Sequence, residues 1–121
     1  MLNFNSLLLF SEAPMKLVDF YRRVLAREPK WQEGEYSGFE VEACALVIGP
    51  HSEVRGRNKN PERIMFNFET ENVKGEFERM KGLGVKVIAE PYHMEGEQDH
   101  LIATLADPDG NYFQLVSPMK S

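Results

Sequence analysis

Few side chains in this sequence could do chemistry, and His100 is the strongest candidate among them. Imidazole titrates near neutrality, so His100 could accept a proton or donate a hydrogen bond to a ligand. The alternative is an exposed histidine at the end of a strand, beside Asp99. His51 and His93 fall in predicted loops and are weaker candidates. The sequence contains no recognisable Ser-His-Asp or Cys-His arrangement and no glycine-rich phosphate loop, so the catalytic residues stay open.

Gln114 stands in a predicted strand directly after a sharp turn. The stretch 107–110 reads Asp-Pro-Asp-Gly, which is typical of a hairpin turn because Pro presets φ, Asp bonds the local backbone and Gly accepts positive φ. The flanking runs 101–106 and 112–116 should therefore pair as antiparallel strands. Side chains alternate along a strand, so Gln114 shares a face with Tyr112. We expect Gln114 to be a cross-strand partner or part of a site.

Aromatic residues offer a second kind of candidate. Trp31 is the only tryptophan and lies in a predicted strand. It either packs in the core or a dimer interface, or it forms a stacking wall for a flat apolar ligand. Tyr36, Phe39 and Tyr112 could join such a wall.

A loop rich in Gly, Asn and Pro is predicted between two structured parts, and it carries most of the local positive charge. It spans residues 51–63 and contains Arg55, Arg57, Lys59 and Arg63 against two glutamates. It is either a solvated linker or a cationic rim that attracts an acidic small molecule.

Composition bounds the class of protein. A chain of 121 residues fits one domain with a real core. Its formal net charge of -5 argues against nucleic-acid binding. No apolar stretch approaches the roughly 20 residues that a membrane helix requires. The single Cys44 reads as a small buried hydrophobe, which together with the lack of a cleavable leader predicts a soluble, cytoplasmic protein.

The chain repeats itself. A strand ending at Phe10 precedes an amphipathic helix with Ser11 as a plausible N-cap, and a strand ending at Phe68 precedes a second helix that Gly84 should end. The strands are 58 residues apart and the helices 57. Each half reads β-α-β-β-β, which favours an internal duplication with module one at 1–50, a linker at 51–62 and module two at 63–117. The predicted strands are 2–10, 30–33, 36–42, 44–48, 63–68, 85–89, 100–106 and 111–116.

This arrangement resembles the vicinal oxygen chelate superfamily, also called the glyoxalase/bleomycin resistance/dioxygenase fold. The motifs that carry the resemblance are LADPDGNYFQLV, LVDFYRRVLA and EFERMKGLGV. The resemblance covers nearly the whole chain and implies a single α+β domain of two βαβββ modules, whose curved mixed sheet encloses a cleft. It also implies a homodimer whose second subunit completes the cleft, with His100, Ile102 and Thr104 lining it beside Gln114.

The resemblance further implies where a metal would bind. In metal-dependent relatives, His or Gln comes from the first strand of a module and Glu from the last. When this pattern is applied to this sequence, the first strands offer Asn5 and Arg63, and the last strands offer Gln114 and an apolar residue at or near Leu46. Neutral amides are poor ligands for a divalent ion, and a guanidinium beside a dication would cost about 8 kcal/mol at an effective dielectric constant of 20. We therefore expect no catalytic metal and no cofactor.

The leading expectation is a metal-independent protein that binds a small organic molecule, as the drug-sequestering branch does. Its expected ligand-binding residues are Asn5, Trp31, Arg63, His100, Thr104, Tyr112 and Gln114. Whether it is an enzyme stays open, since the alternative is a lyase or isomerase similar to lactoylglutathione lyase, in which Arg63 stabilises an oxyanion and His100 moves a proton. A third reading is a dimerisation module with a filled, vestigial cleft.

Overall fold

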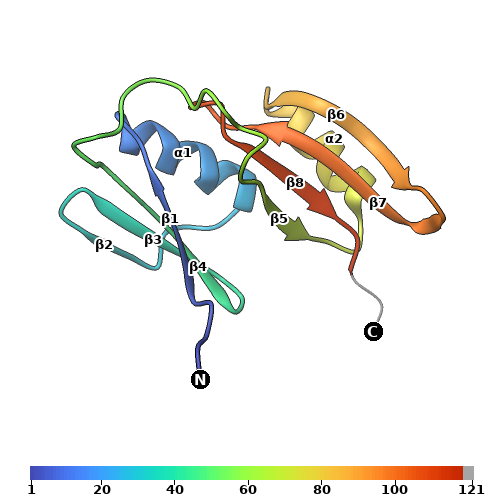
Figure 1. Ribbon diagram of the computed structural model, residues 1–121, viewed down its shortest axis with the longest axis horizontal. Coiled ribbons are helices and arrows are strands. Elements are labelled where there is room, and N and C mark those ends of the chain that lie inside the picture. Colours follow the sequence, from blue (N-terminus) through green and yellow to red (C-terminus); the bar gives the residue numbers. More distant parts are fainter. Residues whose placement is uncertain (119–121) are drawn as a thin grey trace. The chain divides into compact units, whose positions relative to one another are not determined.

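The computed structural model describes residues 1–118, apart from the side chains of Met94 and Glu97. The chain divides into two compact units, one of residues 1–56 and a second that begins at Arg57 (Figure 1). The division falls inside the predicted linker. Each unit is described by itself below.

Each unit contains one helix and one four-stranded mixed sheet. In the first unit the sheet order is β1-β4-β3-β2, and in the second it is β5-β8-β7-β6. The first strand of each unit runs parallel to the last, and the other neighbours are antiparallel. This confirms the predicted α+β class with two βαβββ modules. The elements are β1 Ser6–Phe10, α1 Pro14–Leu25, β2 Trp31–Glu33, β3 Tyr36–Val41, β4 Cys44–Gly49, β5 Phe66–Glu69, α2 Val73–Gly82, β6 Lys86–Met94, β7 Glu97–Ala106 and β8 Tyr112–Val116.

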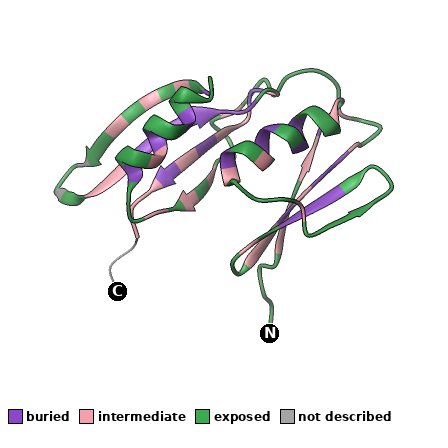
Figure 2. Cartoon of the chain, turned by 180° about the vertical axis from the view of Figure 1, so that it is seen from behind, coloured by how far each residue is buried: buried purple, intermediate pink, exposed green. Residues whose placement is uncertain are grey.

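The core of the first unit lies between α1 and one face of its sheet. Leu17, Tyr21 and Val24 share the buried face of α1, as their helical spacing predicts. They face a sheet surface that includes Phe39 and Leu46, both buried. Figure 2 shows the buried residues of α1 along one side of the helix. In each unit, the sheet face turned away from the helix is called the open face.

The second unit repeats this layering. The predicted face of α2, with Val73, Phe77 and Met80, is buried. The facing side of the sheet contributes Phe113 and other buried apolar residues of β7 and β8. Phe113 also packs against two rings of β5, its centroid lying 6.2 Å from that of Phe66 and 5.7 Å from that of Phe68.

The helix ends follow local chemistry. Asn72 caps α2 by accepting a hydrogen bond from the Gly75 amide at 3.0 Å. Gly84 ends α2 as predicted, with φ of 86° and its amide bonded to the Lys81 carbonyl at 3.0 Å. Ser11 was expected to cap α1 and does not. The N-cap residue is Ala13, and the buried Ser11 hydroxyl, two residues before it, accepts from the Ala13 amide at 3.0 Å rather than from an amide inside the helix.

The first strand and the helix of the two units repeat with a period of 59 residues, which corrects the unequal spacings of 58 and 57. The last strand residues, Phe10 and Glu69, are 59 apart, and so are the first helix residues, Pro14 and Val73. The difference of one residue matters because it exchanges the two faces of a strand. With the period of 59, the open-face residue Leu8 corresponds to Asn67.

Several strand boundaries differ from the prediction. β1 begins at Ser6, later than expected. β5 also begins late, at Phe66, because residues 61–63 form a turn in which the Arg63 amide bonds the Asn60 carbonyl at 3.1 Å. β6 and β7 are longer than expected and meet in a hairpin around Gly96. Pro91 is tolerated because β6 is an edge strand with a register shift between Ala89 and Tyr92.

Candidate functional site

Gln114 is a cross-strand partner. Its Nε2 donates to the hydroxyl Oγ1 of Thr104, 3.0 Å away on the antiparallel neighbour β7. Thr104 is buried and Gln114 half-buried. On its other side Gln114 is in register with Asn67 of the parallel strand β5. Asn67, Gln114 and Thr104 therefore form one polar row across the open face of the second sheet.

Asn67 was not singled out from the sequence. It is exposed, and the Phe residues on either side of it are partly buried toward α2. A polar residue between two aromatic residues in a short strand marks the face that does not enter the core. That alternation is the signal that could have found it.

Two positions carried over from the family do not lie where they were predicted. Arg63 is exposed in the turn before β5, so it is not a first-strand residue. Leu46 is 4% exposed and faces α1, in register with Leu7 and Phe39. For Leu46 the difference is one residue, since its neighbour Val47 lies on the open face, whereas Arg63 precedes the strand by three residues.

With the period of 59, the open-face residues of the β1–β4 and β5–β8 pairs differ in part from the ones predicted from the family pattern. Leu8 pairs with Val47 in the first unit, as Asn67 pairs with Gln114 in the second. Ser6 lies on the same face two residues earlier, and the period of 59 aligns it with Met65, which directly precedes β5. A hydroxyl, a thioether and aliphatic groups are weaker ligands for a divalent ion than imidazole or carboxylate.

The metal that the fold family implies therefore does not fit this donor set. The Asn5 amide oxygen already accepts from the Ser6 hydroxyl at 3.0 Å, and Gln114 donates to Thr104. Among the described residues, no group of three or more His, Cys, Asp or Glu side chains is arranged to hold a metal ion.

Asn5 and Trp31 come together in the first unit. Both line a cavity of about 250 Å³ near the tip of the β3–β4 hairpin. The Trp31 indole lies over Gly38, where a Cβ atom would come within 2.3 Å of the ring. Trp31 nevertheless stays 43% exposed, so one surface of the indole is open. The other lining residues are Lys30, Phe39, Glu40, Glu42, Ala43, Cys44 and Ala45.

Of the remaining aromatic candidates, Tyr36 and Phe39 have structural roles, and Tyr112 stays a candidate for ligand binding. Tyr36 packs its ring over Gly49 and donates its hydroxyl to the Pro50 carbonyl at 2.9 Å, which is a structural role. Phe39 is fully buried in the core. Tyr112 is half-buried and shares the face of Gln114 at the start of β8, and its ligand role stays a prediction.

His100 belongs to β7 and shares the parity of Ile102 and Thr104, so all three lie on one face of that strand. That they line a cleft stays a prediction. Its Nδ1 atom is buried and has no hydrogen-bond partner within the described part of the chain. His93 is exposed and pairs in register with Leu101, whose parity is opposite. The second unit thus holds His100, Thr104, Tyr112 and Gln114, whereas Asn5 and Trp31 belong to the first.

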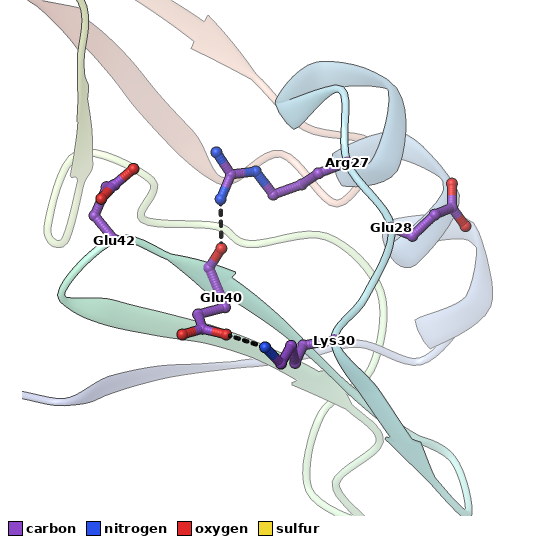
Figure 3. Close-up of a pocket in the computed structure, with 5 residues that line it drawn as sticks. All are labelled: Arg27, Glu28, Lys30, Glu40 and Glu42. Atoms are coloured by element: carbon purple, nitrogen blue, oxygen red, sulfur yellow. Dashed lines mark hydrogen bonds and ion pairs between the residues drawn. The ribbon is translucent and has the colours of Figure 1, made fainter.

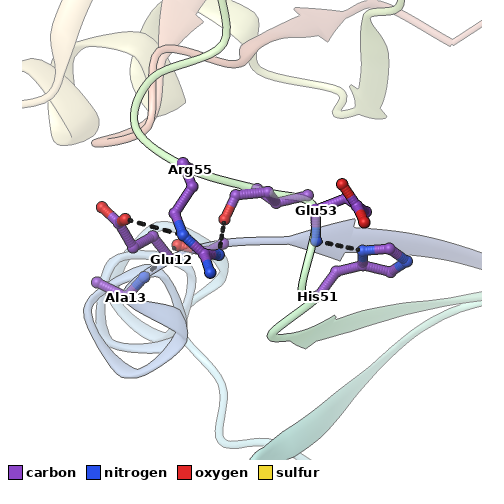
Figure 4. A network of polar contacts seen from close by, with 7 residues as sticks. Glu12, Ala13, His51, Glu53 and Arg55 are labelled. Carbon is purple, nitrogen blue, oxygen red and sulfur yellow. Dashed lines mark hydrogen bonds and ion pairs between the residues drawn. The ribbon is translucent and has the colours of Figure 1, made fainter.

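The basic loop is tied down at both ends. In the first unit, Arg55 forms an ion pair with Glu12 at 3.9 Å, and the Glu53 amide donates to His51 Nδ1 at 3.0 Å (Figure 4). In the second, Arg57 donates to the Pro108 carbonyl at 3.0 Å, and the Asn58 amide donates to the Asp109 carbonyl at 2.8 Å. Arg55 and Arg57 therefore have structural partners, which leaves fewer free cations for the predicted cationic rim.

Within the 107–110 turn, the Asp107 carboxylate bonds to neighbouring residues of the same hairpin, as expected. Asp107 Oδ1 accepts from the amides of Asp109 at 2.9 Å and Asn111 at 3.0 Å, and Oδ2 accepts from Asn111 Nδ2 at 2.9 Å. Asp107 is 4% exposed, so this carboxylate organises the hairpin rather than a ligand.

Comparison with known proteins identifies the class. The paired βαβββ units recur in a lactoylglutathione lyase from Agrobacterium tumefaciens, with 18% identity, a TM-score of 0.75 and coverage of 95% of this chain and 92% of that one. They recur in the fosfomycin resistance protein FosX from Listeria monocytogenes, with 16% identity, a TM-score of 0.68 and coverage of 98% and 93%. These likenesses show the fold.

A family model described as Glyoxalase-like domain matches residues 7–116. The uncharacterized protein YetH of Bacillus subtilis (strain 168) is 34% identical over 88 residues, which cover 73% of this chain and 67% of YetH. The chain therefore belongs to the glyoxalase-like domain family, within the glyoxalase/bleomycin resistance/dioxygenase superfamily. In the described part of the chain, no helix has the length and apolar character needed to cross a membrane.

Proposed function

We propose that this protein binds a small aromatic molecule without a metal ion, and that a second subunit completes the binding cleft. The observation that carries the proposal is the Trp31 indole, supported from beneath by Gly38 and open at the edge of a cavity that Asn5 also lines. An aromatic surface held in this way stacks a flat ligand at little entropic cost. Asn5 supplies a polar group that can orient it.

Metal independence is supported by the donor set. The paired open-face positions of the first and last strands hold Leu8 and Val47 in the first unit, and Asn67 and Gln114 in the second. None of these side chains carries negative charge, so a divalent ion would gain little to offset the loss of its water shell.

The second subunit is supported by exposed apolar side chains. On the open face of the first sheet, Leu8 is 51% exposed in the same register row as Trp31. A homodimer that covers this row would bury apolar surface and enclose the ligand. The expected assembly is a dimer with two equivalent sites.

Fluorescence titration tests the proposal, because Trp31 is the only tryptophan and reports directly on the cavity. A panel of aromatic compounds should include at least one that quenches or shifts its emission saturably, with one site per chain by calorimetry. Light scattering on the same sample gives the oligomeric state. A broad panel without saturable binding contradicts the proposal.

The enzymatic alternative has one specific observation in its favour: the buried Nδ1 of His100 has no hydrogen-bond partner among the residues that the structure describes. A histidine nitrogen free of protein partners can take or give a proton in a reaction. Turnover of a hemithioacetal that is abolished by His100→Ala and retained by His93→Ala would establish this alternative. Arg63 is exposed in a turn, so its predicted oxyanion role has no structural support.

The reading as a dimerisation module without ligand is favoured by cavity size. The cavity of about 250 Å³ is smaller than the roughly 300 Å³ at which ligand pockets typically begin. The same titration decides between the two, since a module without ligand should dimerise and bind no member of the panel.

A further inference from the structure

A second cavity of the first unit has a different character. It measures about 370 Å³ and lies where the chain leaves α1 and passes the β3–β4 hairpin (Figure 3). We call it the mixed-charge pocket, because its lining consists of two cations and three carboxylates. They are Arg27, Glu28, Lys30, Glu40 and Glu42.

Most of these charges pair with each other or with a neighbour. Lys30 Nζ lies 3.1 Å from Glu40 Oε2, and Glu28 Oε1 lies 3.0 Å from Arg22 Nε outside the pocket lining. Arg27 and Glu42 form no ion pair with any residue in the described part of the chain. One guanidinium and one carboxylate are thus left for a ligand, and Figure 3 shows both at the pocket.

The chain fixes the Arg27 guanidinium and the backbone of Glu42. Arg27 Nη1 donates to the Glu40 carbonyl at 2.5 Å, which fixes one edge of the guanidinium and leaves its other N–H groups available. Glu42 occupies the tip of a two-residue hairpin closed by the Val41–Cys44 pair, with φ of 53°. Glycine adopts that conformation at lower cost, so the hairpin gains nothing from glutamate there.

The charge pattern selects the ligand class. A simple anion would meet three carboxylates, and a simple cation would meet Arg27 and Lys30. A molecule carrying one ammonium and one carboxylate satisfies both unpaired groups, because guanidinium binds carboxylate through two parallel N–H bonds. We propose that the mixed-charge pocket binds a small amino acid zwitterion, with its carboxylate on Arg27 and its ammonium on Glu42.

This site does not depend on the proposed aromatic ligand. It shares Lys30, Glu40 and Glu42 with the cavity beside Trp31, but neither Trp31 nor Asn5 lines it. The groups are solvent-exposed, so the expected affinity is weak, with a Kd of about 1–10 mM.

Titration of the full ¹⁵N-labelled chain by NMR tests the site. The probes are glycine, β-alanine, 4-aminobutanoate and 5-aminopentanoate, which differ only in the separation of the two charges. One length should bind best and shift the amide signals of residues 27 and 42 saturably. Propylamine and butanoate, which carry one charge each, should bind at least fivefold more weakly.

Variants complete the test. Arg27→Gln and Glu42→Gln should each weaken binding of the best probe about fivefold, the equivalent of about 1 kcal/mol for an exposed ion pair. Glu35→Gln, at the tip of the β2–β3 hairpin, is the matched control and should leave the affinity unchanged. Glu42→Gly should reproduce the loss with a relaxed turn. Equal binding of the single-charge probes, no saturation by any zwitterion, or unchanged affinity in the Arg27 and Glu42 variants overturns the proposal.

Discussion

Replacing Gly38 by alanine should displace the Trp31 indole from the sheet. The new methyl carbon would lie 2.3 Å from ring atoms of Trp31, closer than any van der Waals contact allows. Gly38 is buried in β3 between β4 and β2, so the backbone cannot move aside and the side chain on the edge strand has to swing away. The indole then loses its support beside the cavity.

The cost follows from the area that the indole covers. Trp31 is 43% exposed, so rather more than half of its surface is in contact with protein. For a side chain of about 250 Å² this is about 140 Å², or about 3.5 kcal/mol at 25 cal/mol per Å². The displaced ring keeps part of its contacts, so the expected loss in unfolding free energy is about 1–2 kcal/mol, a decrease in Tm of about 4–8 °C.

Three measurements on the Gly38→Ala protein check this. Thermal unfolding should show the decrease in Tm, the Trp31 emission should shift to longer wavelength, and the affinity for the best aromatic ligand should fall at least tenfold. Gly82→Ala is the matched control, because a Cβ atom there meets nothing within 4 Å. Unchanged emission and affinity in Gly38→Ala would refute the stacked arrangement of Trp31 on Gly38 and its role in binding.

Three further substitutions test the packing and the polar contacts. Phe113→Ala removes a fully buried ring from the second core and should cost about 3–5 kcal/mol in urea unfolding; a loss below about 1 kcal/mol would contradict the assigned core. Ser37→Ala should leave unfolding free energy unchanged or raise it by about 1 kcal/mol, since the buried hydroxyl has no hydrogen-bond partner in the described part of the chain, and a clear loss would show a missing partner. Thr104→Val should lower the free energy of unfolding by about 1 kcal/mol, because the Thr104 Oγ1 accepts a hydrogen bond from Gln114 Nε2. The freed Gln114 amide should give altered Nε2 proton signals by NMR. Unchanged signals would exclude that bond.

The sequence was sufficient for the fold because its strongest patterns are local. The apolar spacing of Leu17, Tyr21 and Val24 and the Asp-Pro-Asp-Gly turn at 107–110 each determine their element through nearby residues. Both are found as expected. The duplication was also visible, although its period was misjudged by one or two residues.

The site was harder to predict because a strand has two faces and a small register error exchanges them. An apolar residue at or near Leu46 was expected toward the cleft; Leu46 itself faces α1 and its neighbour Val47 lies on the open face, and Arg63 was placed in a strand that begins three residues later. Asn67 was overlooked for the same reason. The assignment of Gln114 succeeded because the turn before it fixes its register with Thr104.

The pairing of Trp31 with Gly38 could not be predicted from the sequence. Nor could the finding that Arg27 and Glu42 have no ionic partner within residues 1–118 as described. Both depend on which side chains meet across strands or between a helix end and a hairpin. Such contacts are set by tertiary packing, and single-residue propensities do not encode them.

Elemental analysis of untagged protein tests the metal-independent account most directly. Protein purified without chelators and dialysed against metal-free buffer should contain zinc, nickel, manganese and iron only in trace amounts, and aromatic ligand binding should be the same with and without a chelator. One tightly held transition-metal ion per chain, lost in a Gln114→Ala variant, would contradict the account.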